Sequence, residues 1–212
     1  MTFQQSSSHP HPPMGGLPVH AVGSPEPGFY LPLVQSFLYE SEKTDLGAVF
    51  VFTSTSPREG VSFVTAAVGR ELAALTGEKV LVAASRAIGN FAPVPGTDSS
   101  EPVIREGNNV FHLRPPQSPN GASRVEKFEL LGQLNKLFRF VLVDSPALSV
   151  SAEALEYGVC SQGIVLVAAA GQVHRSRLVR AKGMIEAAGV RLLGCALNRR
   201  TYPIPGFLYK RL

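Results

Sequence analysis

Short runs of mainly apolar residues recur along the chain, and the segments between them have apolar residues spaced as in an amphipathic helix. An apolar run of about four to eight residues is typical of a strand that is buried on both faces. Such runs lie at residues 48–52, 80–84, 110–113, 140–143, 164–168 and 190–197. We therefore expect strands at these positions.

Helical periodicity appears at residues 29–40, 60–76, 123–138 and 175–188. In the second segment, spacings of three and four predict one buried stripe, formed by Val61, Val64, Val68, Leu72 and Leu75. Gly77 follows this segment as a helix C-terminal glycine should. In the third, Ser123 and Glu126 match a capping box. The predicted inner face of that helix consists of Val125, Phe128, Leu131, Leu134 and Phe138.

This alternation predicts an α/β fold, a mainly parallel sheet with helices on both faces in a three-layer sandwich. We expect one such domain over residues 29–200, with irregular loops at residues 88–107 and 115–122. Residues 1–28 are rich in Pro, Ser, Gly and His and lack apolar periodicity, which predicts a disordered tail. Residues 201–212 form a basic C-terminal tail.

Composition narrows the functional classes. The chain is 44% hydrophobic and 17% charged, as in globular proteins, with a formal net charge of +4. This modest charge permits contact with anionic lipid or an acidic protein but argues against a dedicated nucleic-acid binder. The sequence has no long apolar run and no secretory signal pattern. We interpret Cys160 and Cys195 as core thiols in a reducing compartment, and therefore expect a cytoplasmic protein.

The segment from Thr55 to Ser62 follows an apolar strand and opens an amphipathic helix, which is the setting of a Walker A phosphate-binding loop. Gly60 and Ser62 occupy the positions of its second glycine and its hydroxyl. Thr55 replaces the first glycine and Val61 replaces the lysine, whose cation would contact the β- and γ-phosphates. The segment therefore has the strand–loop–helix setting of a nucleotide-binding site but lacks the lysine cation.

A parallel sheet places its ligand at the carboxyl ends of its strands. We therefore expect residues 54–62, 84–87, 144–147 and the region of Asn198 to meet there. Arg58 and Arg86 would lie at the mouth of this site, where they could bind an anion with the helix N-terminus. In the alternative that we prefer, Arg86 fills the metal position and pairs with Asp144.

The order of motifs resembles that of the bacterial tyrosine autokinases (the BY-kinase family), P-loop kinases of capsule and exopolysaccharide export within the ParA/MinD-like superfamily. Residues 52–62 are similar to their first motif, residues 140–146 to their third, and residues 163–168 and 187–199 to their last two strands. The resemblance implies a P-loop NTPase-like fold that uses ATP and Mg²⁺.

Several residue roles follow from this resemblance. The vestigial nucleotide site would consist of Arg58, Glu59, Gly60, Ser62 and Asn198. Ser62 and Asp144 would hold the metal, and Asp144 is the candidate catalytic residue. Tyr202 and Tyr209 would be phosphoacceptors. A membrane polysaccharide co-polymerase, or an active autokinase, would be the partner, which places the protein at the inner face of the cell membrane when it is bound.

The departures from the family pattern are systematic. Arg58 replaces a glycine, Val61 replaces the lysine, and Ala84-Ser85-Arg86 stands where the family has Asp-x-Asp. We therefore expect a catalytically degenerate relative with an accessory or regulatory role in exopolysaccharide or capsule biosynthesis and export, without a bound cofactor. The alternatives are an active ATP-dependent tyrosine autokinase, with ATP and Mg²⁺ as cofactors, and a ParA/MinD-type ATPase relative.

Each candidate residue also has a purely structural interpretation. Ser62 can serve as a helix N-terminal hydroxyl, and Asp144 can cap the Ser-Pro turn. Asn198 can be an ordinary strand-terminal residue, and Tyr202 and Tyr209 can belong to a frayed terminus. The basic face of the last helix, which includes Arg177 and Arg180, can be a solvated surface.

Overall fold

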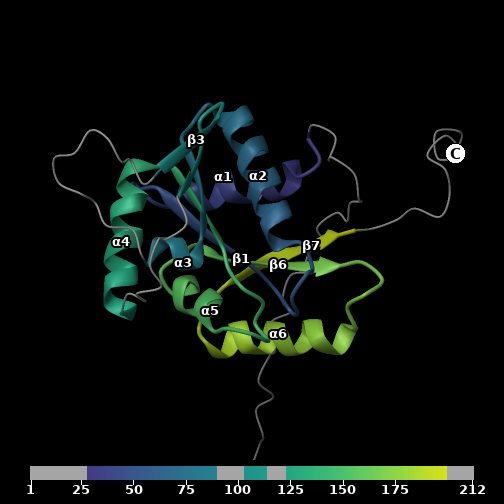
Figure 1. Ribbon diagram of the computed structural model, residues 1–212. Helices are drawn as coiled ribbons and strands as arrows, with labels where there is room; N and C mark the ends of the chain where they lie inside the picture. The colour runs from purple at the N-terminus through teal and green to yellow at the C-terminus, as the bar shows by residue number, and fades with distance from the viewer. Residues whose placement is uncertain (1–27, 90–102, 114–122, 200–212) are drawn as a thin grey trace, which may run out of the picture.

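The predicted apolar runs lie side by side in one sheet of seven strands (Figure 1). The computed structural model of the 212-residue chain describes residues 28–89, 103–113 and 123–199. The strand order is β3-β4-β2-β5-β1-β6-β7. All neighbours in this order are parallel except β3 and β4. The strands are β1 (Ala48–Ser54), β2 (Val80–Ala84), β3 (Val103–Gly107), β4 (Val110–Leu113), β5 (Phe140–Asp144), β6 (Gly163–Ala169) and β7 (Leu192–Asn198).

Helices cover both faces of the sheet, as predicted. α1 and α2 lie on one face, and α3, α4, α5 and α6 lie on the other (Figure 1). Successive β1 side chains alternate between the two cores: Phe50 packs on the α1 side, where its ring stacks on Phe37 at 3.8 Å between centroids, while Val51 packs on the opposite side. The helices are α1 (Leu31–Ser41), α2 (Val61–Thr76), α3 (Ser85–Ile88), α4 (Arg124–Leu137), α5 (Glu153–Gly158) and α6 (Arg175–Ala187).

Two predicted helix ends have the expected chemistry. At the start of α4, the Ser123 amide donates to the Glu126 carboxylate at 2.7 Å, and the Glu126 amide donates to the Ser123 hydroxyl at 3.3 Å. At the end of α2, Gly77 adopts φ +70°, and its amide donates to the Ala73 carbonyl at 2.9 Å. The capping box and the terminal glycine are confirmed.

Some sequence expectations were wrong. Residues 103–107 form β3 rather than a loop, because they pair antiparallel with β4 while exposing side chains that carry no apolar pattern. The short helices α3 and α5 were not predicted. Leu75 and Val125 are 53% and 65% exposed; Leu75 lies in the last turn of α2 and Val125 in the first turn of α4. Cys160 and Cys195 are exposed rather than core residues.

Other expectations concern residues outside the described ranges. The loop at 115–122, the tail at 201–212 and all of the predicted tail at 1–28 except Gly28 lie outside the described residues. Within the described ranges, none of the helices combines the length and the apolar character needed to cross a bilayer.

Candidate functional site

A pocket of about 350 Å³ opens at the carboxyl ends of β1, β2 and β5. The strand register explains why these ends meet: Asp144 is aligned with Phe52 on one side and with Ala84 on the other. The pocket walls come from the loop after β1, from the start of α3, and from the turn after β5. Three of the four predicted segments therefore line one pocket.

Asp144 is the central ionisable group of this pocket. Burial raises the pKa of its carboxyl group, while a hydrogen bond from the Ser62 hydroxyl and the positive charge of Arg86 act in the opposite direction, and the net shift is upward. Ser62, Asp144 and Arg86 are thus brought together. The Arg86 cation acts electrostatically on the carboxylate that the resemblance assigns to a metal.

The buried carboxylate of Glu59 fixes the shape of the loop. Glu59 is only 4% exposed. Its Oε1 accepts hydrogen bonds from the Thr55 hydroxyl and from the Ser56 amide, both at 2.6 Å. Its Oε2 accepts from the Ala169 amide of β6 at 3.4 Å. Glu59 therefore serves here to tie the loop to the sheet, since buried carboxylates need such donors.

Asn198 supports the same loop from β7. It is 8% exposed, and its Nδ2 donates to the main-chain carbonyl of Glu59 at 2.9 Å. Its Oδ1 accepts from the Arg199 amide at 2.9 Å. A Cβ at Gly60, which has φ +91°, would lie 2.0 Å from the same Nδ2. Asn198 thus packs against the loop backbone and does not line the pocket formed by Asp144 and Arg86.

The loop retains a glycine-like conformation at a position that holds an arginine. Arg58 has φ +68°, in the left-handed region that costs a residue with a side chain about 1 kcal/mol. Its exposed side chain lies at the pocket, together with Pro57 and Gly60. The loop therefore has an arginine at a backbone conformation that favours glycine.

Val61 begins α2 directly after the left-handed Gly60. It is half-buried and packs against the core on the α1 side of the sheet. Near it, Phe63 and Val150 contribute exposed apolar side chains to the pocket. The position of a Walker lysine is thus part of an apolar contact.

Sequence reasoning missed two polar features of the site. The Ser85 hydroxyl donates to the Glu153 carboxylate of α5, and the Tyr157 hydroxyl donates to the Ser85 carbonyl at 2.9 Å. These contacts join residues far apart in the sequence, and α5 itself was not predicted. The Ser145 hydroxyl is 3% exposed and has no hydrogen-bond partner among the described residues. Only the Asp-Ser-Pro motif pointed to this turn.

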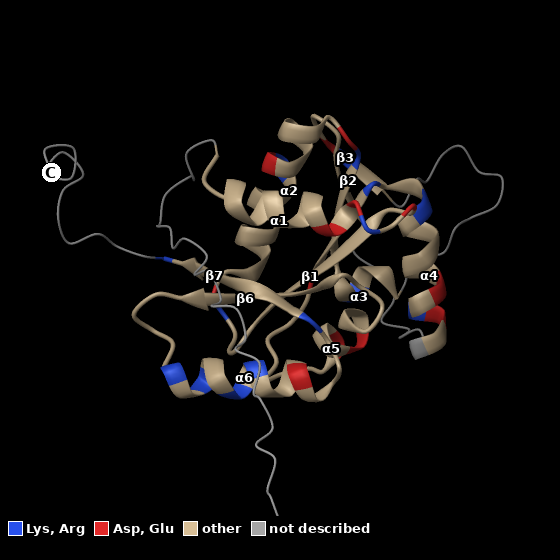
Figure 2. Ribbon diagram, turned by 180° about the vertical axis from the view of Figure 1, so that it is seen from behind, with Lys and Arg blue, Asp and Glu red and all other residues tan. Residues whose placement is uncertain are grey.

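The remaining predicted residues do not line this pocket among the described residues. Tyr202 and Tyr209 fall outside the described residues. The basic residues of α6 lie on the opposite side of the loop, and its Lys and Arg positions are concentrated along one stretch of the helix (Figure 2).

The sheet order, the strand–loop–helix unit and the aspartate that ends β5 define a P-loop NTPase-like α/β fold. No family model matches the chain. It is 29% identical over 105 residues to CapB of Staphylococcus aureus, across 49% of this chain and 46% of that protein. It is 27% identical over 85 residues to the tyrosine-protein kinase CpsD of Streptococcus agalactiae, across 40% and 37%. The matches thus span less than half the length of these curated relatives.

Solved structures share the fold. The chimerical protein CapA2B2 superimposes with a TM-score of 0.61 at 21% identity, covering 79% of this chain and 82% of that one. The kinase domain of the Escherichia coli tyrosine kinase ETK gives 0.60 at 17%, covering 75% and 72%. MinD of Pyrococcus horikoshii, solved with Mg-ADP, gives 0.56 at 19%, covering 78% and 76%. The chain is therefore similar to these tyrosine-protein kinases over part of its length and shares the fold of the solved kinase domain, as its motifs indicated.

Proposed function

We propose that this protein is a catalytically degenerate relative of the bacterial tyrosine autokinases, with an accessory or regulatory role in exopolysaccharide or capsule biosynthesis and export. The observation that carries this proposal is Val61 at the position of the Walker lysine, packed against the core. Phosphoryl transfer depends almost entirely on positioning and on electrostatic stabilisation of the phosphates. An apolar side chain supplies neither.

The metal position supports the same conclusion. The Asp-x-Asp carboxylates are replaced by Ala84 and Arg86, so Asp144 has an arginine beside it in place of two acids. A cation at this place repels a divalent metal ion, and Mg²⁺ prefers carboxylate and phosphate oxygens. Ser62 and Asp144 would be the remaining ligands for Mg²⁺, and the geometry favours a protein-only network here.

One observation favours the alternative of an ATP-dependent tyrosine autokinase or a ParA/MinD-type ATPase. Ser62 and Asp144 remain in hydrogen-bond contact, and the start of α2 presents backbone amides near Arg58. Those amides and an arginine could hold a phosphate without lysine. The two functions therefore differ in whether Mg-ATP binds.

Isothermal titration calorimetry with Mg-ATP separates them. We expect no heat of binding to the full chain at concentrations that saturate an intact relative. In a variant with Val61→Lys, Ala84→Asp and Arg86→Asp together, we expect binding to appear. A matched control with Val61→Met, Ala84→Asp and Arg86→Asp has similar bulk at residue 61 but no charge there. A micromolar dissociation constant for the natural chain would overturn the proposal.

Restoring the lysine alone should not restore chemistry, because residues that act as a catalytic unit do not contribute independently. We expect Val61→Lys to give no phosphotyrosine at Tyr202 or Tyr209 when it is incubated with Mg-ATP. Detection by mass spectrometry of the phosphorylated C-terminal peptide would contradict the proposed degeneracy.

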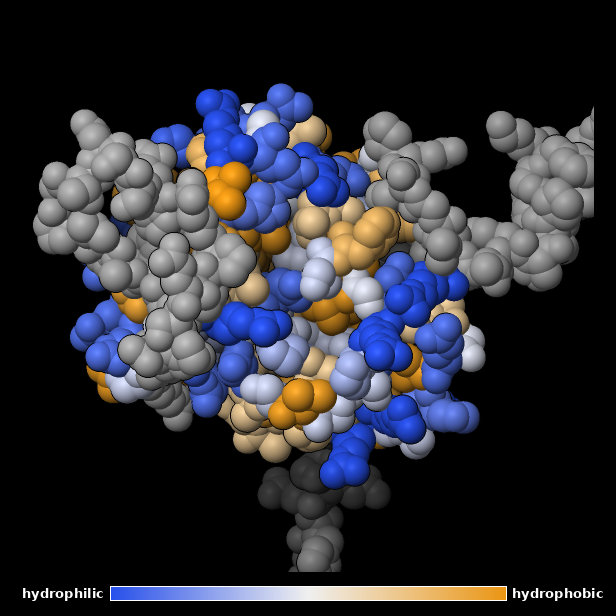
Figure 3. Space-filling view, viewed as in Figure 1, coloured by the Kyte–Doolittle hydropathy of each residue, from blue (hydrophilic) through white to orange (hydrophobic). Residues whose placement is uncertain are grey.

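We further propose that the protein docks on a membrane polysaccharide co-polymerase or on an active autokinase. Among the described residues seen in Figure 3, hydrophobic side chains lie singly or in small groups between hydrophilic ones. The basic stretch of α6, with Arg175, Arg177 and Arg180 exposed, is the surface best suited to an acidic partner (Figure 2).

Co-sedimentation with membranes that contain the co-polymerase tests this docking. Association should weaken as salt is raised and should decrease in Arg175→Glu. Lys136→Glu on α4 makes the same change of charge elsewhere and should have little effect. Equal behaviour of the two variants, or recovery in the supernatant at low salt, would remove the support for docking through α6.

A further inference from the structure

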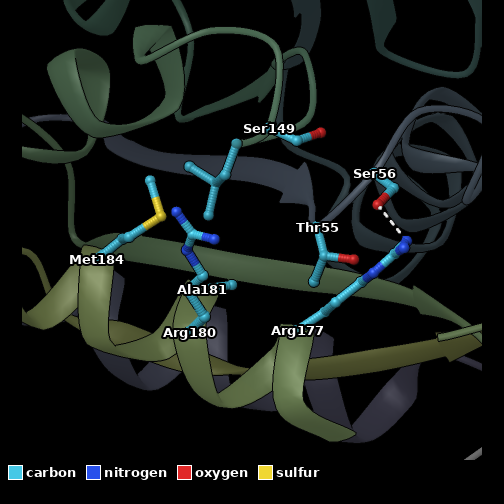
Figure 4. Close-up of a pocket in the computed structure, with 8 residues that line it drawn as sticks. Thr55, Ser56, Ser149, Arg177, Arg180, Ala181 and Met184 are labelled. Atoms are coloured by element: carbon cyan, nitrogen blue, oxygen red, sulfur yellow. Dashed lines mark hydrogen bonds between the residues drawn. The ribbon is translucent and has the colours of Figure 1, made fainter. Parts of the chain in front are cut away.

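A second pocket, of about 520 Å³, lies on the α6 side of the loop and shares no lining residue with the first. Figure 4 shows Arg177 and Arg180 rising from α6 towards the loops that carry Ser56 and Ser149. One Arg177 nitrogen donates to the Ser56 hydroxyl at 3.2 Å. The pocket thus brings together two guanidinium groups and the hydroxyl groups of Ser56 and Ser149, while the Thr55 hydroxyl, also in its lining, donates to Glu59.

The positive charge of this pocket is not neutralised by the described part of the chain. No carboxylate lines it, and within the described ranges neither Arg177 nor Arg180 forms an ion pair. Glu186, the acidic residue of α6, instead pairs with Lys182 at 3.5 Å. Two arginines left without an anion at a concave surface are suited to a dianionic group.

The other wall of the pocket is apolar. Leu148 is 8% exposed and Ala181 is 3% exposed, so the floor between the loop and α6 is a hydrophobic surface. Met184 lies at the rim, one helical turn beyond Arg180 (Figure 4). Its thioether side chain can adapt to a flat aromatic ring. The ligand that matches both walls carries a compact anion directly on an apolar group.

We propose that this pocket binds an aromatic phosphomonoester, and specifically a phosphotyrosine side chain of a protein partner. Arg177 and Arg180 contact the phosphate oxygens, the hydroxyl groups of Ser56 and Ser149 donate to the same group, and the ring lies on Leu148 and Met184. A lipid phosphate fits less well, because its apolar part stays in the bilayer and leaves this floor uncovered. The site is separate from the nucleotide pocket, so the inference stands whether or not Mg-ATP binds.

Calorimetry of the full chain with phenyl phosphate, and then with an O-phosphotyrosine peptide, tests the proposal. We expect binding that weakens about tenfold or more in each of Arg177→Gln and Arg180→Gln, as expected for removal of one charged hydrogen-bonding partner. Arg175→Gln removes the same charge from the same helix but does not line the pocket. It should change the affinity less than twofold.

Two further comparisons examine the apolar wall. Inorganic phosphate should bind more weakly than phenyl phosphate, and Met184→Ser should reduce the affinity for phenyl phosphate while leaving that for inorganic phosphate unchanged. Equal affinities for the two ligands would overturn the aromatic assignment. Equal losses in Arg175→Gln and Arg180→Gln, or tighter binding to phosphatidic-acid vesicles than to the peptide, would overturn the site itself.

The outcome can be separated from that of the nucleotide experiment. Arg177→Gln with Arg180→Gln should abolish binding of phenyl phosphate. Heat from Mg-ATP that persists in this double variant would belong to the first pocket and would count against the proposed degeneracy. Unfolding curves of the variants should match that of the natural chain, because both arginines are exposed.

Discussion

The two pockets on either side of the loop after β1 both contain arginine and serine side chains. They differ in whether the arginine charge acts on a carboxylate of the protein. On the β5 side, the Arg86 charge acts on Asp144, which also accepts a hydrogen bond from Ser62, so the ionisable groups have partners within the protein. On the α6 side, the cations face a concave surface without a carboxylate. The difference is that the charged groups on the β5 side act on one another, whereas the two arginines on the α6 side face no carboxylate among the described residues.

The two pockets stay separate only if the loop between them is rigid. We expect the largest change in stability from a substitution at Gly60, where this loop contacts Asn198 of β7. Gly60→Ala combines φ +91° with a Cβ 2.0 Å from Asn198 Nδ2. We expect a loss of about 3 kcal/mol in the free energy of unfolding, measured by urea denaturation. Gly77→Ala is the matched control, because Gly77 has φ +70° but open space around its Cβ.

The control should lose only about 1 kcal/mol, the cost of the left-handed backbone alone. Similar losses at the two glycines would show that the contact with Asn198 does not hold the loop. In that case the two pockets would not be separated by a rigid wall, and phenyl phosphate and nucleotide binding would be expected to influence each other.

A smaller effect is expected on the pH dependence of stability, through Asp144 in the pocket on the β5 side of the loop. The pKa of Asp144 lies above its ordinary value of 3.8, and burial is the largest cause. As pH rises through the interval above 3.8, the unfolded chain releases this proton before the folded one does, so this group makes folding less favourable. Asp144→Asn should remove that part of the pH dependence. In Arg86→Gln, the Asp144 pKa should rise further.

Carbon-detected NMR titration of the Asp144 carboxyl group measures this directly. Arg86→Lys keeps the charge and serves as the control, with a pKa close to that of the natural chain. An unchanged pKa in Arg86→Gln would show that the arginine does not act on the aspartate. The two pockets would then no longer differ in whether their arginines interact with a carboxylate.

The smallest effect is expected at the tip of the loop. Arg58→Gly should relieve the left-handed strain and stabilise the fold by about 0.5 kcal/mol, since part of the gain is offset by the greater flexibility of glycine when unfolded. Arg58→Ala removes the same side chain but keeps the strain, so it should not stabilise. A gain of equal size in both variants would assign the effect to the side chain rather than to φ.

The sequence predicted the positions of the central strands better than the side-chain contacts between elements. Apolar runs identified the central strands because these are buried on both faces, and the parallel order then placed residues 54–62 and 144–147 at one edge. β3 escaped prediction because its exposed residues depend on pairing with β4. Short runs of polar sequence carry no such signal.

Within the site, local sequence indicated which residues could act but not what they contact. Glu59 was predicted to belong to a vestigial nucleotide site, whereas its carboxylate binds Thr55 and the amides of Ser56 and Ala169. The link from Ser85 to α5 depends on a tertiary approach that no spacing encodes. The second pocket likewise forms only when α6 packs beneath the loop.

The position of β1 in the sheet has a consequence for how the chain folds. Its two neighbours are β5 and β6, which come from the second half of the sequence, and none of the strands nearer in sequence pairs with it. Such non-local pairing slows folding, because long loops must close before contacts form. During synthesis, the apolar segment Ala48–Ser54 therefore lacks its partner strands until residues 140–169 have left the ribosome, and in that interval it is the part of the described chain most in need of protection from aggregation.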